Sequence, residues 1–275
     1  MGRSPTTRWG LLVLLALLLG ASRAHGSPLS EAVSALLPTD VILLGEQHDA
    51  PEHQRLQEGF VVELAQRGQI AALAIEMAER GASTQGLARE AAEDQVRAAL
   101  RWNEKAWDWA RYAPVVMAAV RHAVPVLGAN LERAAMGAAM ADDALDAHLN
   151  PALMAQQRDR VRVGHCMLLP ESRIAPMTRI QIARDAAMAG TIATAVRPGQ
   201  AVLLVAGAAH VDAALGVPTH LAATLRRKVV IAVAGAEAAT QAYRVDLLWP
   251  TPPVPLKDHC AELGRQLGPR EPASP

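Results

Sequence analysis

The chain has 275 residues, with 27 Lys and Arg against 27 Asp and Glu, and 51% of its residues are hydrophobic. These values suit one globular domain with a large core and exclude a disordered or collagen-like chain. The formal net charge is zero and no run of Lys or Arg occurs, which argues against a nucleic-acid partner because such binding depends on concentrated positive charge. We therefore expect a small molecule or a protein as the partner.

The N-terminal residues 1–26 have the features of a secretory signal peptide. Arg3 and Arg8 precede an apolar run over residues 11–19, and small residues follow it. The run is too short to cross a membrane as a helix. Ser22 stands where a lipoprotein signal would carry its lipidated cysteine. We expect an exported, soluble periplasmic protein without a lipid anchor.

Residues 27–249 are predicted to form a single α/β domain with a mostly parallel central sheet flanked by helices, because short apolar runs alternate with longer helix-like stretches. The predicted strands are residues 41–45, 70–75, 124–127, 201–206, 229–233 and 243–248. The predicted helices are residues 51–67, 110–122, 151–163 and 176–196. Three of these helices begin at or near a proline, which is tolerated in the first turn.

The C-terminal residues 250–275 are rich in proline, and we expect an extended arm followed by a disordered tail. Cys166 and Cys260 are the only cysteines. Two cysteines of an exported protein usually pair when they approach each other. We therefore expect a disulfide that ties the arm to the domain, and we do not expect a nucleophilic thiol.

Polar side chains follow four of the predicted strands. Glu46 and His48 follow the first, Glu76 the second, Asn130 the third and His210 the fourth. The carboxyl ends of parallel strands lie at one edge of a sheet, so these side chains should converge there. Their chemistry allows two uses: imidazole and carboxylate groups bind a divalent transition metal, or they act as general acid and base without one.

Two further features lie near these residues in the sequence. His53 stands one turn into the helix after His48 and either faces the site or is a solvated helix residue. On the helix over residues 176–196, one face carries Met177, Gln181, Arg184 and Met188, with Asp185 beside it. An Arg flanked by methionines suits the carboxylate end of a flat apolar ligand. The alternative is an ordinary surface pair between Arg184 and Asp185.

Aromatic residues make up only 3% of the chain, yet Trp102, Trp107, Trp109 and Tyr112 lie close together. Trp102, Trp109 and Tyr112 share one helical face. They either line a pocket for a planar ligand or anchor a core that is otherwise rich in Ala and Leu. If the hydroxyl of Tyr112 is buried, it needs a hydrogen-bond partner.

Several motifs occur in the order found in the ChaN-like family of exported haem-binding proteins, which is part of the Tiki superfamily, and the chain resembles this family from residue 41 to residue 225. The motifs are residues 44–53 (LGEQHDAPEH), 75–77 (IEM), 109–114 (WARYAP), 129–133 (ANLER), 164–170 (GHCMLLP), 181–189 (QIARDAAMA), 207–210 (GAAH) and 216–218 (GVP). Several motifs in register make the resemblance specific. Family members are often lipoproteins, and Ser22 departs from that pattern.

The resemblance implies haem binding linked to haem or iron uptake or handling. His48, His210 and Tyr112 are then the candidates for the axial ligand, since haem iron is held by His or Tyr in many proteins. Arg184 would neutralise a propionate. The remaining expected cofactor-binding residues are Asn130, His165, Gln181, Asp185 and Met188. A homodimer and haem-uptake components of the outer membrane or envelope are the expected protein partners.

Two alternatives remain open at this point. Related members of the superfamily are hydrolases, so Glu46, His48, Glu76 and His210 would in that case bind a divalent transition metal or serve as acid and base in peptide or ester hydrolysis. The other alternative is a binding module without a cofactor that recognises an envelope partner through the proline-rich arm.

Overall fold

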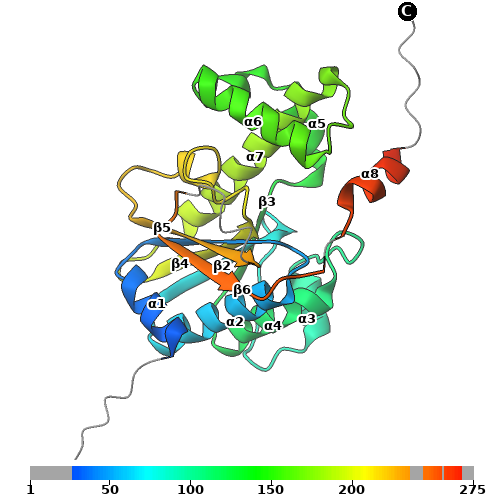
Figure 1. Ribbon diagram of the computed structural model, residues 1–275. Helices are drawn as coiled ribbons and strands as arrows, with labels where there is room; N and C mark the ends of the chain where they lie inside the picture. Colours follow the sequence, from blue (N-terminus) through cyan, green and yellow to red (C-terminus); the bar gives the residue numbers. More distant parts are fainter. Residues whose placement is uncertain (1–26, 236–243, 256, 268–275) are drawn as a thin grey trace, which may run out of the picture.

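The structure is a computed structural model that describes residues 27–235, 244–255 and 257–267. Its centre is a six-stranded sheet in the order β3-β2-β4-β1-β5-β6 (Figure 1). The strands are β1 (Val41–Glu46), β2 (Ile70–Glu79), β3 (Val126–Asn130), β4 (Ala201–Gly207), β5 (Arg227–Ala234) and β6 (Leu247–Thr251). Every neighbouring pair of these strands is parallel. The predicted α/β class with a parallel sheet is confirmed.

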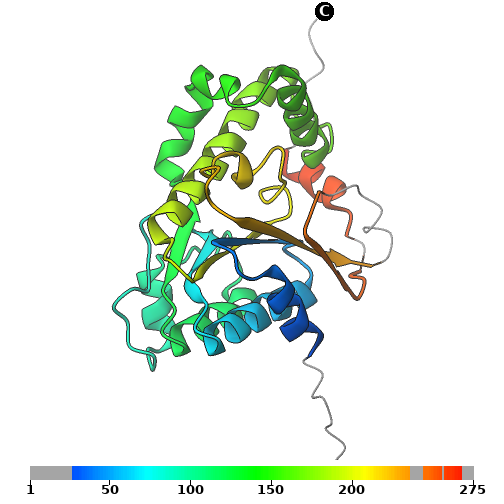
Figure 2. The same ribbon diagram turned by 90° about the vertical axis from the view of Figure 1, so that its left-hand side faces the viewer.

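Helices cover both faces of the sheet (Figures 1 and 2). They are α1 (Pro28–Leu36), α2 (Pro51–Gln66), α3 (Glu93–Ala99), α4 (Trp109–Arg121), α5 (Met136–Ala141), α6 (Pro151–Gly164), α7 (Glu171–Ala195) and α8 (His259–Leu267), with short 3-10 turns at Arg133–Ala135, Asp143–Ala147 and Val217–Thr219. None of the described helices is both long and apolar enough to cross a membrane.

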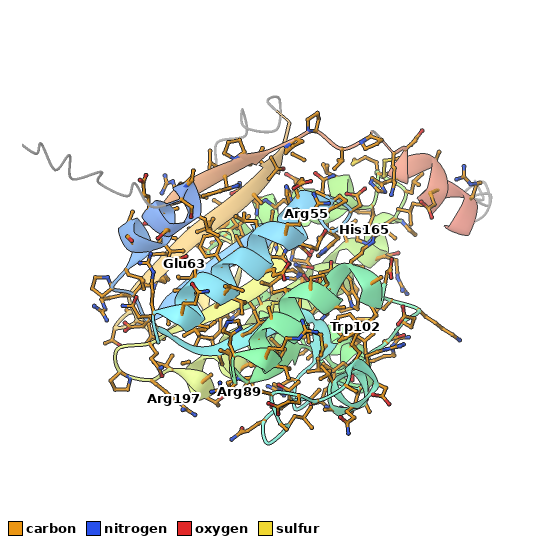
Figure 3. All side chains as sticks on the ribbon, turned by 90° about the horizontal axis from the view of Figure 1, so that it is seen from below. Arg55, Glu63, Arg89, Trp102, His165 and Arg197 are labelled. Carbon is orange, nitrogen blue, oxygen red and sulfur yellow. A yellow bond between two sulfur atoms is a disulfide. The ribbon has the colours of Figure 1, made fainter. Side chains whose placement is uncertain are left out.

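Both faces of the sheet are buried, which explains why the strands appear in the sequence as continuous apolar runs. Ile42 and Leu44 of β1 face a core formed with α1 to α4, and α2 and α4 lie side by side over that face (Figure 3). Val41 and Leu43 face the other side, where Met188 and Ile192 of α7 complete a second core. Alternate side chains of one strand thus serve two cores.

Helices α5 and α6 and the first half of α7 stand beyond the sheet and are called the helical lobe here, residues 133–185 (Figures 1 and 2). Leu149, Met154 and Ile182 of the lobe form a small apolar cluster with Leu215 from the segment after β4. Arg160 pairs with Asp212, and His148 bonds to Thr219, in the same segment. The lobe is therefore attached to the domain both by α7, which continues onto the sheet, and by the segment after β4.

Several element boundaries differ from those predicted. β3 begins at Val126, after Pro125, and includes Asn130, which the sequence placed beyond the strand. α7 begins at Glu171 with Pro176 inside it, because a proline in the second turn removes only one backbone hydrogen bond. Part of the predicted strand over residues 243–248 lies outside the described residues.

The C-terminal region differs most from the expectation. β6 extends to Thr251 and contains Pro250, so the predicted boundary at residue 249 falls inside a strand. Proline is tolerated there because β6 is an edge strand. The expected arm is short, and it leads into the helix α8. The signal-peptide prediction concerns residues 1–26 and falls outside the described residues.

A close approach between β2 and β3 requires glycine at position 128. A Cβ atom there would lie 2.1 Å from the carbonyl oxygen of Glu79, whereas at Gly137 in α5 it would meet no atom within 4 Å. We predict that Gly128→Ala lowers the free energy of unfolding by about 2 kcal/mol or more, since the backbone must move. Gly137→Ala, the matched control, should raise it by about 0.5 kcal/mol through helix propensity. Urea unfolding of the two variants tests this, and equal values would contradict it.

Candidate functional site

The carboxylate of Glu46 is the first of two buried charges at the carboxyl edge of the sheet. Glu46 ends β1, and its side chain is fully buried. It accepts hydrogen bonds from Tyr112 Oη at 2.8 Å, from Gln54 Nε2 at 2.6 Å and from Gln57 Nε2 at 2.5 Å. His48 Nδ1 also lies 2.8 Å from it. The carboxylate is thus surrounded by donors, as a buried charge requires.

Gln54 and Gln57 were not identified from the sequence, although they fix the position of Glu46. Both lie on α2 and are buried, three residues apart on one face of the helix. α2 begins at Pro51, directly after the loop that carries His48, so its first turns face the strand end. The available signal was this pair of amides on a helix face that is otherwise apolar. If Glu46 were lost, each amide would lack its partner, at a cost of about 1–3 kcal/mol.

His48 is the one imidazole of the site that is open to solvent. Its side chain is 41% exposed, against 6% for His210. The edge of its ring packs against Trp107, with ring centroids 4.8 Å apart. Its Nε2 atom lies 3.8 Å from Glu76 Oε2, which is beyond hydrogen-bond distance. A carboxylate on Nδ1 therefore orients an imidazole whose other nitrogen has no direct hydrogen bond to any described residue.

Gly207 at the end of β4 leaves space for this ring. A Cβ atom at Gly207 would lie only 3.0 Å from His48 Nε2. The backbone N–H of Gly207 donates to Glu76 Oε2 at 2.8 Å. The glycine of the Gly-Ala-Ala-His motif thus has two roles: it avoids His48, and it donates to the second buried carboxylate.

Glu76, the second buried charge, links the sheet to α7. Arg184 of α7 donates from Nη2 to Glu76 Oε1 at 3.2 Å and from Nε to the Asn130 side-chain oxygen at 2.9 Å. The amide of Asn130 donates to the backbone oxygen of Glu76 at 2.9 Å. Arg184 is therefore part of the site and does not form a surface pair with Asp185. Its guanidinium is already engaged within the protein.

His210 lies between two carboxylates. Its Nδ1 is 2.5 Å from Asp185 Oδ1, and its Nε2 is 3.4 Å from Glu76 Oε1. The amide nitrogen of Gln181 lies 2.9 Å from His210 Nδ1. Asp185 and Gln181 both come from α7. Two carboxylates on the two ring nitrogens favour a doubly protonated, cationic imidazole.

The ionisation of His210 and of its two carboxylate neighbours, Glu76 and Asp185, follows from this geometry. Burial alone would lower the pKa of His210, but the charges of Glu76 and Asp185 outweigh it and raise the pKa to about 10. Burial would raise the pKa of Glu76, yet the positive charges of His210, His48 and Arg184 hold it well below its usual range. Burial raises the pKa of Asp185 to about 6, and its Oδ2 has no hydrogen-bond partner among the described residues.

The pKa values of His48 and Tyr112 are set by Glu46, which both side chains contact. Burial alone would lower the pKa of His48, but the hydrogen bond that its Nδ1 donates to Glu46 and the charge of Glu76 raise it above the usual value. Burial and the charge of Glu46 raise the pKa of the Tyr112 phenol far above its ordinary range. Tyr112 is therefore held as a neutral donor to Glu46.

The structure brings Glu46, His48, Glu76, Asn130 and His210 together at the strand ends, as the parallel sheet predicts, and it adds Tyr112, Gln181, Arg184 and Asp185 to them.

His53 is neither at the site nor solvated. It is buried, accepts from the Gln47 N–H and pairs with Thr251 of β6. Trp109 belongs to the core, while Trp107, which is not on the predicted face, contacts His48.

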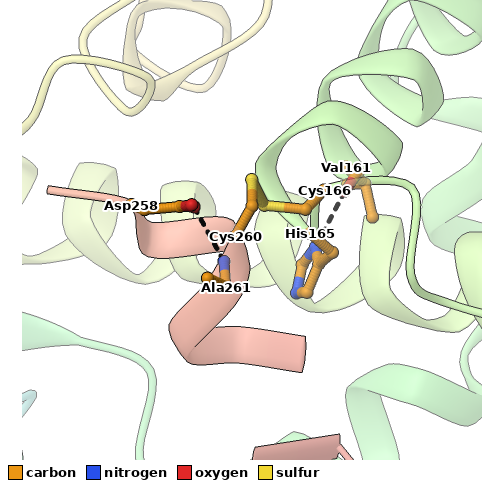
Figure 4. The surroundings of a disulfide bond; sticks show 6 residues. All are labelled: Val161, His165, Cys166, Asp258, Cys260 and Ala261. Atoms are coloured by element: carbon orange, nitrogen blue, oxygen red, sulfur yellow. Dashed lines mark hydrogen bonds between the residues drawn. A yellow bond between two sulfur atoms is a disulfide. The ribbon is translucent and has the colours of Figure 1, made fainter. Parts of the chain in front are cut away.

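Two predicted cofactor-binding residues lie apart from the others. Met188 is fully buried in the core between α7 and the sheet, so its side chain does not reach the surface of the site. His165 caps the C-terminus of α6, where its Nδ1 donates to the Val161 carbonyl at 2.8 Å beside the disulfide (Figures 3 and 4). No hydrogen bond or ion pair joins His165 to the carboxyl edge within the described residues.

Within residues 27–235, 244–255 and 257–267, no group of three or more His, Cys, Asp or Glu side chains is arranged to hold a metal ion. The four residues expected as metal ligands are instead engaged by one another and by neighbouring side chains, through hydrogen bonds and ion pairs. Each carboxylate already has two or more donors from the protein. The arrangement as it stands can orient an exposed imidazole and hold a proton on a buried one.

Comparison with known proteins assigns this architecture to a family. The family described as haem-binding uptake, Tiki superfamily, ChaN matches residues 32–221, more than half of the chain. The chain belongs to this ChaN-like haem-binding uptake family, as its motifs indicated.

A solved structure, described as cofacial heme binding to ChaN of Campylobacter jejuni, has the same fold. The TM-score is 0.63 at 24% sequence identity, and the match covers 75% of this chain and 86% of the other. No curated protein matches the chain.

The shifted pKa of His210 makes stability depend on pH. The folded protein holds the His210 proton up to a pKa of about 10, whereas the unfolded chain loses it near 6.5. The free energy of unfolding should therefore fall as the pH rises from about 7 to about 9.5, because only the folded state still binds the proton. Urea unfolding across this range should show a flatter slope for His210→Gln than for the wild type. His122→Gln, an exposed histidine at the end of α4, is the control and should keep the wild-type slope; a wild-type slope in His210→Gln would contradict the assignment.

Proposed function

We propose that this protein is an exported haem-binding protein linked to haem or iron uptake or handling, and that it binds haem at the carboxyl edge of its sheet. Family membership supports haem binding, and the match to the structure of ChaN supports the fold. The observation that carries the proposal is His48, a half-exposed imidazole oriented by a buried carboxylate. Histidines that ligate metals commonly have such a carboxylate on the other ring nitrogen.

Among the three candidates for the axial ligand, the geometry favours His48. Tyr112 is 2% exposed and donates to Glu46, so its phenolate would face a buried negative charge. His210 is held between Glu76 and Asp185, which occupy both of its nitrogens. The side chain of His48 is half-exposed, and its Nε2, which lies 3.8 Å from Glu76 Oε2, has no hydrogen-bond partner among the described residues. Bound haem would supply an iron that accepts this imidazole.

The surroundings of His48 also suit the rest of the ligand. Trp107 offers an aromatic edge beside the imidazole, which suits a flat apolar macrocycle. Arg111 donates to the backbone oxygen of His48 at 3.1 Å and is partly exposed, as is Arg184. Arg111 would face a propionate, while Arg184, which already donates to Glu76 and Asn130, would add positive charge beside it. A second copy of the chain and envelope haem-uptake components remain the proposed partners.

Export is supported by two features. The disulfide Cys166–Cys260 is present, as predicted, and disulfides persist in oxidising compartments. The N-terminal sequence has the features of a signal peptide, and Ser22 cannot take a lipid anchor. We therefore propose a periplasmic location for the mature chain.

A haem titration followed by absorption tests the proposal, with protein that begins at residue 27. We expect a saturable Soret shift in the wild type and a loss of affinity of at least about tenfold in His48→Ala, because the ligand to iron is removed. Tyr112→Phe and His210→Ala should keep the wild-type position of the Soret band, since neither residue would touch iron. His122→Ala is the matched surface control.

Other outcomes would reject parts of this proposal. No saturable shift in the wild type would reject haem binding. Loss of the band in Tyr112→Phe with retention in His48→Ala would make Tyr112 the ligand. A transition metal bound to the purified protein and lost in the histidine variants, without a Soret shift, would instead favour the metal-dependent hydrolase alternative.

A further inference from the structure

The peptide unit between Glu46 and Gln47 leads from the buried carboxylate to His48, and it is held on both sides. Its carbonyl oxygen accepts a hydrogen bond from the Ala208 N–H at 2.9 Å, which continues the pairing of β1 with β4. Its N–H donates to His53 Nδ1 on α2, also at 2.9 Å. The second bond depends on a side chain, so the identity of residue 53 decides whether this N–H is paired.

His53 accepts through Nδ1 because its other nitrogen is used as a donor. The hydroxyl of Thr251 in β6 donates its only proton to the Val233 carbonyl of β5 at 3.2 Å. Thr251 Oγ1 therefore accepts from His53 Nε2, which lies 3.0 Å away. A neutral imidazole carries one proton, so Nδ1 is left as the acceptor for the Gln47 N–H. The edge strand β6 thus selects the tautomer that the loop after β1 requires.

The burial of His53 makes the loop depend on this tautomer. The residue is 1% exposed. Burial lowers the pKa of its imidazole, although the charges of Glu46 and Asp49 act in the opposite direction, so the ring stays neutral at pH 7. Loss of the ring acceptor would leave the Gln47 N–H facing an apolar interior, and an unpaired buried donor is unfavourable.

Other side chains hold the backbone on the far side of His48. Its carbonyl oxygen accepts from Arg111 Nη1 at 3.1 Å and from Gln54 Nε2 at 3.4 Å. These bonds fix the chain after the imidazole, while His53 fixes the chain before it. A side chain on a short loop keeps its direction only when the surrounding residues hold its backbone and rotamer in place.

We propose that His53 and Thr251 are positioning residues of the haem-binding site, an inference that rests on the proposed function. They transmit the position of the edge strand β6 to the loop that carries His48 and thereby fix the direction of its imidazole. Neither residue would touch the ligand, since Thr251 acts through His53, and His53 acts through the backbone of Gln47. A strand from the C-terminal end of the sequence is in this way part of the site.

Two pairs of variants separate this role from a general effect on stability. His53→Leu removes the acceptor, whereas His53→Asn keeps one, because its side-chain oxygen can take the place of Nδ1. Thr251→Val removes the hydroxyl, and Thr251→Ser keeps it. Thr219→Val is the matched control, since Thr219 makes the same kind of hydrogen bond, at 2.8 Å, to His148 of the helical lobe.

The first readout needs no ligand and is the hydrogen exchange of the Gln47 amide, measured by NMR on protein that begins at residue 27. Exchange should be at least about tenfold faster in His53→Leu and about threefold faster in Thr251→Val, because local opening becomes more populated. His53→Asn, Thr251→Ser and Thr219→Val should keep the wild-type rate. The double variant of His53→Leu and Thr251→Val should match His53→Leu alone, since Thr251 acts only through His53.

Two results of this measurement would overturn the proposal. One is an unchanged Gln47 exchange rate in both His53→Leu and Thr251→Val. The other is an equal acceleration in Thr219→Val, because the effect would then be a general loss of stability. Near-ultraviolet circular dichroism of each variant establishes that it is folded.

The second readout is the dissociation constant for haem, from the Soret titration. It should rise at least about fivefold in His53→Leu and Thr251→Val and stay within about twofold in His53→Asn, Thr251→Ser and Thr219→Val. Faster Gln47 exchange with unchanged haem affinity would overturn the positioning role. Failure of the wild type to bind haem would reject the proposed function, while the exchange rates would still decide whether His53 and Thr251 hold the loop.

Discussion

The burial of two carboxylates, Glu46 of β1 and Glu76 of β2, at the carboxyl ends of the two parallel strands on either side of β4 is the constraint on which the rest of the site depends. A charge removed from water must be compensated by donors and by opposite charge. Glu46 obtains them from α2 and α4, while Glu76 obtains them from the end of β4 and from α7. The helices on both faces of the sheet are therefore tied to its edge by the same requirement.

This arrangement separates two histidines that the sequence makes look alike. Each is the last residue of a Gly-x-x-His motif. His210, however, lies between the carboxylates of Glu76 and Asp185, whereas His48 has a carboxylate on Nδ1 only. The first imidazole holds a proton and fixes α7 against the sheet. The second is oriented but available to a ligand. The difference arises from α7, which brings Asp185 to only one of them.

The site is shared between the sheet and the helical lobe. Glu46 and Glu76 belong to strands of the sheet and His48 to the loop after β1, while Gln181 and Arg184 lie where α7 enters the lobe. The sheet has two extensive cores, and the lobe packs on the domain through smaller apolar clusters. The disulfide Cys166–Cys260 joins α8, which follows the edge strand β6, to the loop before α7.

The sequence by itself determined the fold class, and it predicted that polar side chains converge at the strand ends and that the two cysteines pair, as the structure has them. These conclusions follow from local patterns: apolar runs of strand length, the polar residue that ends each run, and the number of thiols. The family motifs follow from the same residues, since they coincide with those strand ends.

Only the tertiary structure decided which residues act together. Gln54 and Gln57 meet Glu46, Arg184 turns to Glu76 and not to its neighbour Asp185, and His53 is buried against β6. Met188 is core and His165 stands beside the disulfide. Helical periodicity gives the face on which a residue lies but not what that face meets, and burial, which sets every pKa in the site, exists only once distant elements have packed.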